Sequence, residues 1–230
     1  MKVIGLVGGM SWTSTLEYYR LINEFTAARL SGFHSARMVL YSLDFDEIER
    51  AQHEARWDDA TDIIVSAGKA LRQAGADFLL ICANTMHKVA EPVSERSGLP
   101  LLHIGDVVGS AIKEAGFNKV GLLGTKFVME EDFYRDRLER NFGIEVLVPP
   151  EMERRVVNGI IYEELCQEKI ESISRQKILQ VIKGLVARGA EGIILGCTEL
   201  PLLIGPDDIS IPLFNTMQLH AEASVQRALA

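Results

Sequence analysis

Three cysteines are the side chains of this sequence best suited to proton transfer or nucleophilic attack. Cys82 follows the apolar run FLLI and is itself followed by Ala83 and Asn84, whereas Cys197 follows the run GIILG and precedes Thr198. Their number and spacing match neither a disulfide framework nor a CxxC metal motif, so free thiols are expected. Because the thiolate is the reactive form of cysteine, the environment of each thiol decides its chemistry.

Cys197 is the strongest of the three candidates. It follows a predicted buried strand and opens a turn, so backbone N–H groups and the hydroxyl of Thr198 lie nearby. Such surroundings predict a lowered thiol pKa. The alternative is a buried and inert cysteine, since free cysteine is among the most buried residue types. Cys166 lies among charged residues within a predicted helix and is expected to be incidental.

Other motifs are less specific. The turn GLVGGM, which ends at Met10, departs from the G-x-G-x-x-G pattern of dinucleotide loops. We expect it to be a tight strand-to-helix turn that presents N–H groups to a small anion. His87, three residues after Asn84, is predicted in the first turn of a helix, either orienting a group in the site or serving as a hydrogen-bonded structural histidine. No metal site and no cofactor are predicted.

Composition excludes two classes of partner. The formal charge is −8 and no run of lysine and arginine is present, so a nucleic-acid partner is not expected. No apolar stretch approaches the roughly 20 residues of a membrane span. The first residues read as a strand rather than a signal peptide, so a cytoplasmic protein is expected.

Strand-like and helix-like patterns alternate along the chain. Short apolar runs ended by glycines are followed by amphipathic stretches of about 12 to 18 residues, which is typical of βαβ units. The sequence therefore predicts an α/β fold with parallel sheets.

The pattern occurs twice. IGLVGGM resembles VGLLGTK, with Gly5 and Gly121 116 positions apart, and LRQAGADFLLICANT resembles LVARGAEGIILGCTE, with Gly75 and Gly189 114 positions apart. Two matches in the same order favour duplication over coincidence between short apolar runs.

We therefore predict two similar lobes related by a pseudo-two-fold axis. Residues 1–98 plus 213–230 would form the first lobe and residues 99–212 the second. The cysteine-bearing and glycine-bearing turns all fall at the C-terminal ends of predicted strands, where ligands of such folds bind. The predicted active site lies in the cleft between the lobes.

Taken together, these motifs resemble the aspartate/glutamate racemase family, which are cofactor-independent amino-acid racemases. The resemblance runs from GLVGGMSW through CANTMH and Gly124–Thr125 to IILGCTELP, and SLDFDEIE and HKVAEPV are similar to the bacterial aspartate/glutamate branch. The resemblance implies Rossmann-like lobes, an acidic amino acid as the ligand, no cofactor and a homodimer.

The family mechanism, by resemblance, uses two thiols on opposite faces of Cα, one taking the α-proton and the other donating one. Cys197 matches one of these thiols. Positions that match the family's substrate-binding residues are Met10, Asn84, Thr85, Thr125 and Thr198. From the segment ERAQHEARWD we choose Gln52 as the residue that faces the substrate's side-chain carboxylate.

The first thiol of the family departs from this pattern. Family members carry Cys directly before the Asn, but here Ala83 occupies that position and Cys82 stands one place earlier. The internal repeat likewise aligns Ala83 with Cys197. A shift of one residue along a strand turns a side chain to the other face, so Cys82 is predicted to point away from the cleft unless a bulge or a tight turn at the strand end redirects it.

Three functions remain compatible with this departure. The first is a slow or one-directional racemase that uses Cys82, a water or Thr85 in place of the missing thiol. The second is a one-thiol decarboxylase or isomerase of the same superfamily. The third is a protein that has lost catalysis and binds an acidic amino acid. We favour the first, because the second thiol motif is intact.

Overall fold

The computed structural model describes residues 1–230, and its internal contacts divide the chain into two compact units. Unit 1 comprises Met1–His103 together with His220–Ala230, and unit 2 comprises Ile104–Leu219. The boundaries predicted from sequence, 98/99 and 212/213, lie a few residues before these junctions. The second junction falls inside one helix, α11 (Thr216–Leu229), so no loop marks it in the sequence.

Unit 1 contains a three-stranded parallel sheet of order β2-β1-β3. Its elements before the second junction are β1 (Ile4–Gly8), α1 (Trp12–Leu30), β2 (Met38–Ser42), α2 (Phe45–His53), α3 (Trp57–Gln73), β3 (Phe78–Ile81), the 3-10 turn η1 (Thr85–Val89) and α4 (Ala90–Ser97). Strands β1 and β3 are buried throughout. Strand β1 is central, with helices on both faces of the sheet, whereas β3 is an edge strand that carries an isolated bridge to Leu101.

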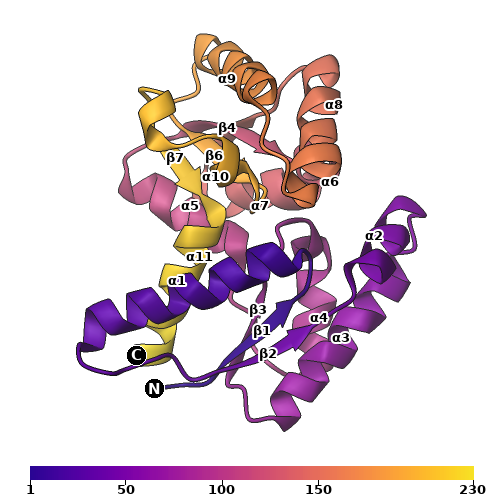
Figure 1. Cartoon of the computed structure of the whole chain (residues 1–230), viewed down its shortest axis with the longest axis vertical. Coiled ribbons are helices and arrows are strands. Elements are labelled where there is room, and N and C mark those ends of the chain that lie inside the picture. The colour runs from indigo at the N-terminus through magenta and orange to yellow at the C-terminus, as the bar shows by residue number, and fades with distance from the viewer. The chain divides into compact units, whose positions relative to one another are not determined.

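Helices cover the unit 1 sheet on two sides. Figure 1 shows α1 along one side of the strands and α3 and α4 along the other. Helix α3 places Ile64 and Leu71 in an apolar cluster with Leu79 and Ile81 of β3. Helix α1 begins at an N-cap, Ser11, whose hydroxyl accepts a hydrogen bond from the Ser14 amide.

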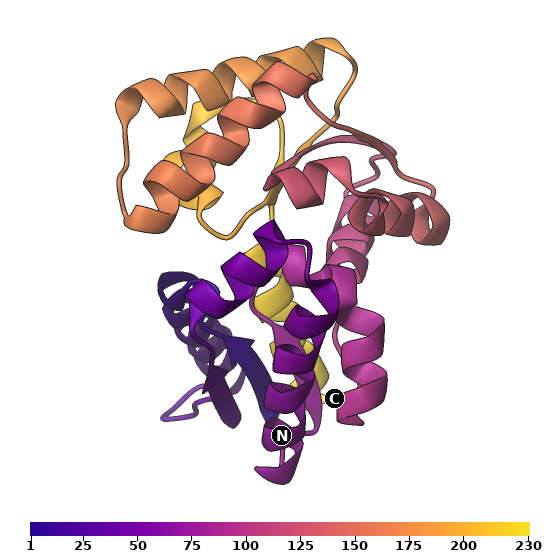
Figure 2. The ribbon, with the colours of Figure 1, turned by 90° about the vertical axis from the view of Figure 1, so that its right-hand side faces the viewer.

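Unit 2 contains a four-stranded parallel sheet of order β5-β4-β6-β7. Its elements are α5 (Ile104–Glu114), β4 (Lys119–Gly124), α6 (Lys126–Glu130), α7 (Asp132–Phe142), β5 (Glu145–Leu147), α8 (Glu151–Gly159), the π turn η2 (Ile160–Glu164), the 3-10 turn η3 (Leu165–Gln167), α9 (Ser172–Ala187), β6 (Ile193–Gly196), α10 (Leu200–Leu203), the 3-10 turn η4 (Pro206–Asp208) and β7 (Leu213–Asn215). Helices α8 and α9 run side by side in unit 2 (Figure 2).

The two units repeat the same strand register. In unit 1, Gly5 of β1 pairs with Leu79 of β3, and in unit 2, Gly121 of β4 pairs with Ile193 of β6. The prediction of an α/β fold built from two similar parallel sheets is therefore confirmed. The run LPLLHIGD, predicted to be a strand, makes only an isolated bridge through Leu101 before α5 begins at Ile104.

Candidate active-site residues

Two neighbouring strands of unit 2 end in glycines that bring their C-terminal turns close together. Gly124 of β4 pairs with Gly196 of β6. A Cβ on Gly124 would lie 2.8 Å from the Gly196 carbonyl oxygen, and a Cβ on Gly196 would lie 2.8 Å from the Leu123 carbonyl oxygen. Only glycine allows this approach. The residues that follow, Thr125 and Cys197, consequently lie at the same edge of the sheet.

The thiol of Cys197 lies against a buried carboxylate. Cys197 Sγ donates to Glu199 Oε2 at 3.0 Å, and the Thr198 hydroxyl donates to the same oxygen at 2.7 Å. All three side chains are buried, with exposed fractions of 4 to 7%. A carboxylate held by two donors in a buried turn fixes the position of the thiol and can exchange a proton with it.

The electrostatics of this turn differ from the prediction made for Cys197. Burial and, after it, the negative charge of Glu199 raise the pKa of the Cys197 thiol well above its ordinary value. The expectation of a lowered pKa was therefore wrong, because it gave nearby N–H groups more weight than burial of the thiol and did not include an adjacent carboxylate. The resting state of Cys197 is the thiol, a proton donor.

Cys166 lies close to the same buried turn as Cys197. It lies in the 3-10 turn η3 rather than in mid-helix, and it packs against the apolar cluster of unit 2 that contains Cys197. Burial and the charge of Glu199 raise the pKa of the Cys166 thiol to about 12. The sequence gave no reason to associate Cys166 with Cys197, because the two lie 31 positions apart.

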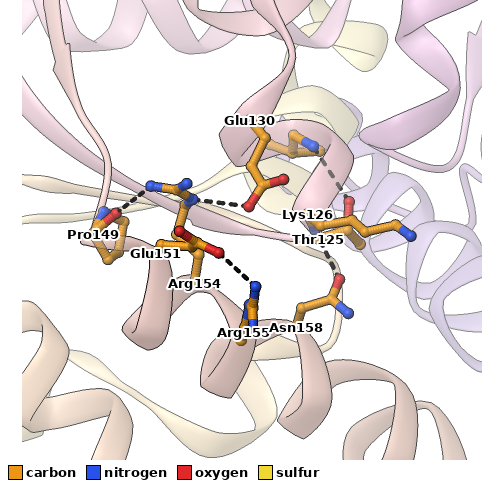
Figure 3. A network of polar contacts seen from close by, with 9 residues as sticks. Thr125, Lys126, Glu130, Pro149, Glu151, Arg154, Arg155 and Asn158 are labelled. Carbon is orange, nitrogen blue, oxygen red and sulfur yellow. Dashed lines mark hydrogen bonds and ion pairs between the residues drawn. The ribbon is translucent and has the colours of Figure 1, made fainter.

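Thr125 is fixed by a polar network between α6 and α8 (Figure 3). Its hydroxyl caps α6 by accepting from the Val128 amide at 3.4 Å, and the next amide, that of Lys126, donates to Asn158 Oδ1 at 2.8 Å. Arg154 of α8 binds Glu130 Oε1 at 2.9 Å and thereby joins the far ends of the same two helices. Thr125 is thus a buried residue in a fixed turn.

The matching strand end of unit 1 carries Ala83. The apolar cluster that includes α3 contains every second residue at this strand end, Leu79, Ile81 and Ala83. The corresponding cluster of unit 2, with α9, contains the residues 114 positions further on, Ile193, Leu195 and Cys197. The side-chain alternation of the two strands therefore places Ala83 where unit 2 has its thiol.

Cys82 lies in the sequence between Ile81 and Ala83, two residues that share one apolar cluster. It is fully buried, is absent from the cluster that contains Ile81 and Ala83, and continues the strand ladder through its amide, which donates to the Val7 carbonyl at 2.9 Å. Burial raises the pKa of its thiol. The last residue of β3 is Ile81 and the backbone bends at Cys82, so the side-chain direction expected from strand alternation stays a prediction.

Histidines support the turn after β3. His87 Nδ1 donates to the Ala83 carbonyl oxygen at 2.8 Å, and its ring contacts those of His103 and His220 at centroid distances of 4.7 and 5.7 Å. His220 Nε2 lies 2.9 Å from the Leu102 carbonyl oxygen and its Nδ1 lies 2.9 Å from the Tyr18 hydroxyl. His87 therefore orients the backbone at Ala83.

The other predicted residues of unit 1 lie near the same turn. Asn84 and Thr85 are buried in it, and Met10 belongs to the apolar cluster of Ala83. Gln52 of α2 is buried, with Nε2 2.9 Å from Met86 Sδ and Oε1 without a hydrogen-bond partner. The glycine turn differs from its predicted role in one respect: the Gly9 amide already donates to Thr15 Oγ1 at 2.8 Å.

Glu199 is the residue that sequence reasoning missed. Its signal was the position two places after Cys197, within the motif GCTEL.

No group of three or more histidine, cysteine, aspartate or glutamate side chains is arranged to hold a metal ion. None of the helices is long and apolar enough to cross a membrane.

Comparison with known proteins adds independent information. A model of the Asp/Glu/hydantoin racemase family matches residues 7–224. A Yersinia pestis crystal structure, proposed to be an Asp/Glu racemase, is 49% identical with a TM-score of 0.94, and each chain is covered completely. An aspartate racemase homologue from Pyrococcus horikoshii is 36% identical with a TM-score of 0.87, again over the whole of both chains.

A curated relative extends this similarity. The broad specificity amino-acid racemase RacX of Bacillus subtilis is 24% identical over 99% of both chains. The family model covers nearly the whole chain, including both strand ends described above. The chain therefore belongs to the Asp/Glu/hydantoin racemase family, and the expectation of a racemase-type enzyme is confirmed at that level.

Proposed function

We propose that this protein racemises an acidic amino acid, aspartate or glutamate, without a cofactor, and that Cys197 carries the proton transfer. The contact between Cys197 Sγ and Glu199 Oε2, at 3.0 Å, is the observation that supports this most directly. A relative named as an amino-acid racemase and a solved structure named as an aspartate racemase homologue support the reaction class. Removing an α-proton requires a positioned base, and this turn holds a thiol beside a proton acceptor.

The proton has a defined route in this proposal. Transfer of the thiol proton from Cys197 to Glu199 leaves a thiolate, which takes the α-proton of the amino acid and becomes a thiol again. The electron pair of the broken C–H bond remains on the amino acid as a carbanion-like state, which needs hydrogen-bond donors such as Thr125 or Asn84. Return of a proton from Cys197 to Cα re-forms the starting enantiomer and the thiolate, and Glu199 then gives its proton back to Cys197 to restore the resting thiol. Inversion instead requires a proton donor at the other face of Cα.

Ala83 makes this cycle one-sided. Its methyl group neither accepts nor donates a proton, so donation at the other face of Cα depends on a water, Thr85 or a displaced Cys82. Exchange of the α-proton with solvent is therefore expected to be faster than inversion of configuration. The same observation favours a second candidate function, a one-thiol decarboxylase, in which Cys197 protonates the enolate left by loss of carbon dioxide.

Deuterium exchange at Cα distinguishes these functions. The wild-type protein is incubated in D₂O with L-aspartate, D-aspartate, L-glutamate and D-glutamate, and both exchange and enantiomer formation are followed. Exchange with one of the four, accompanied by slower formation of its enantiomer, is the expected result. Carbon dioxide release from a malonate-type acid without any exchange would instead establish the decarboxylase.

A binding protein would give a third result. Thermal stabilisation by aspartate or glutamate, with neither exchange nor carbon dioxide release, would overturn catalysis while keeping the ligand class. Cys197→Ala serves as the control, since loss of exchange with retained stabilisation separates chemistry from binding.

We also propose that the protein is a cytoplasmic homodimer. The outer face of α1 supports dimerisation, because Trp12, Leu16 and Tyr19 lie at helical spacing and are 52 to 64% exposed. Sedimentation equilibrium of the wild type and of Trp12→Glu tests this. A monomeric wild type would contradict it.

A further inference from the structure

A basic pocket lies in unit 1 at the C-terminal ends of α3 and α4. Its volume is about 410 Å³, and it is lined by Lys69, Arg72, Gln73, Arg96 and Ser97. Three of these side chains are cationic and none is acidic. The pocket is thus locally positive in a chain of formal charge −8.

Two of the three cations have no partner within the protein. Arg96 Nη2 binds Asp62 Oδ1 at 2.6 Å, but Lys69 and Arg72 make neither an ion pair nor a hydrogen bond. Other arginines of unit 1, such as Arg20 and Arg56, are paired with neighbouring carboxylates. Like charges placed together without a counter-charge are an arrangement that a bound anion would stabilise.

The backbone brings these side chains to one place. Lys69, Arg72 and Gln73 are spaced i, i+3 and i+4 on α3 and so share a face of the helix. Helix α4 ends at Gly98, which has a φ of 71°, and a Cβ there would lie only 2.4 Å from Arg72 Nη1. The guanidinium of Arg72 therefore packs directly against the backbone at the end of α4.

We propose that this pocket binds a phosphate-bearing small molecule. The planar fork of Arg72 and the point charge of Lys69 are the donors that suit the oxygens of a phosphate group. The amide of Gln73 adds a neutral donor at the same wall. A volume of about 410 Å³ accommodates an organic portion as well as the phosphate.

Isothermal titration calorimetry with two probes tests the proposal. Inorganic phosphate and glycerol 3-phosphate are titrated into the wild type, with acetate at matched ionic strength as the carboxylate comparison. Both phosphates are expected to bind, glycerol 3-phosphate more tightly, and acetate weakly. Failure of glycerol 3-phosphate to bind, or tighter binding of acetate, would overturn the proposal.

Matched variants locate the site. The double variant Lys69→Gln/Arg72→Gln is expected to weaken phosphate binding about 100-fold, since each lost charge-assisted hydrogen bond contributes about a factor of ten. Arg37→Gln/Lys177→Gln removes the same charge from exposed positions outside the pocket and should bind as the wild type does. Equal weakening in both double variants would mean a general charge effect and would overturn the pocket assignment.

Thermal unfolding gives a second readout. Lysine and arginine near helix C-termini also stabilise the helix dipole, a role that requires no ligand. Phosphate is expected to raise the Tm of the wild type but not of Lys69→Gln/Arg72→Gln. A lower Tm of that variant together with an unchanged phosphate response would assign the two cations to helix stabilisation alone and would contradict the proposal.

Discussion

The strand ends after β3 and β6 share a backbone arrangement but carry different chemistry. In unit 2, Cys197 follows Gly196 and its thiol contacts the carboxylate of Glu199. In unit 1, the matching position is Ala83, whose carbonyl is held by His87. The same strand-and-turn backbone therefore forms with or without an acid–base group at the end of the strand.

The residues around the two strand ends also differ in chemical type. All five histidines of the chain lie in unit 1, and the ring of His87, whose Nδ1 binds the Ala83 carbonyl, contacts those of His103 and His220. Unit 2 has no histidine, and its strand end combines a thiol and a carboxylate instead. Histidine rings support the backbone of one unit, whereas a thiol and a carboxylate in the other are suited to proton transfer.

Removing the thiol of unit 2 should have the largest effect. Cys197→Ala is expected to lower α-proton exchange by about 1000-fold, within the range for loss of a general acid–base group. Cys82→Ala removes the thiol of unit 1 and should leave exchange within about twofold of wild type, because strand alternation predicts that Cys82 points away from the substrate. Exchange rates for both variants, measured by NMR in D₂O, test this contrast. Equal losses would show that Cys82 reaches the substrate.

Neutralising the carboxylate of unit 2 should have the next largest effect. Glu199→Gln keeps the shape of the side chain but removes its charge, and exchange is expected to fall about 10- to 100-fold. Because the Glu199 charge raises the pKa of Cys197, the variant thiol should react with iodoacetamide at lower pH than the wild-type thiol. The pH profile of alkylation, followed by mass spectrometry, measures this shift.

Glu163→Gln is the matched control, since it removes an exposed carboxylate from the same unit. Its exchange rate and alkylation profile should equal those of wild type. An unchanged alkylation profile in Glu199→Gln would mean that the carboxylate does not set the state of the thiol.

The histidine cluster makes a prediction for unit 1. Burial lowers the pKa of His220 to about 4, compared with 6.5 for an exposed histidine. As the pH falls below about 6.5, His220 becomes protonated in the unfolded chain but stays neutral in the folded one. The free energy of unfolding therefore decreases down to about pH 4, where the folded chain binds the proton as well. The loss should be about 2 kcal/mol between pH 7 and pH 5.

Hydrogen exchange at the two pH values separates the units. Corrected for intrinsic rates, protection of β1 and β3 should fall at pH 5 by more than that of β4 and β6, and His220→Gln should remove the difference. Equal losses in both units would assign the acid sensitivity to carboxylates rather than to His220.

The alignment of the two strand ends could be predicted from the sequence, because the alternation of side chains along a strand is a local property. Matching Gly75 with Gly189 aligned Ala83 with Cys197, and the apolar clusters of the two units have the same alignment. The parallel sheets also followed from the alternation of apolar runs and helices. The segment around Leu101 was the exception, because an apolar run of that length suits a strand or a helix start equally well.

The electrostatics of the strand ends could not be predicted in the same way. Whether Glu199 turns toward Cys197 depends on side-chain torsions in the turn, which no sequence pattern specifies. The position of Cys166 near the same cluster depends on how η2 and η3 fold back on α9, a tertiary property. The sign of the Cys197 pKa shift was therefore wrong even though its position on the strand was right.

Restoring a thiol to unit 1 should have the smallest effect on rate, but it tests the comparison most directly. If Ala83 occupies the position of a missing acid–base group, Ala83→Cys supplies a donor for the other face of Cα. Inversion is expected to rise about tenfold, less than the roughly 100-fold or more of a well-positioned general acid, because the new thiol is not optimised. Exchange, which depends on Cys197 and Glu199 of unit 2, should change little, so the ratio of exchange to inversion should fall. Ala83→Val enlarges the side chain similarly without adding a proton donor, and it controls for crowding of this buried position. A rise in inversion with both variants would trace the effect to packing, whereas a rise with the cysteine alone would show that the two strand ends differ in function by one side chain.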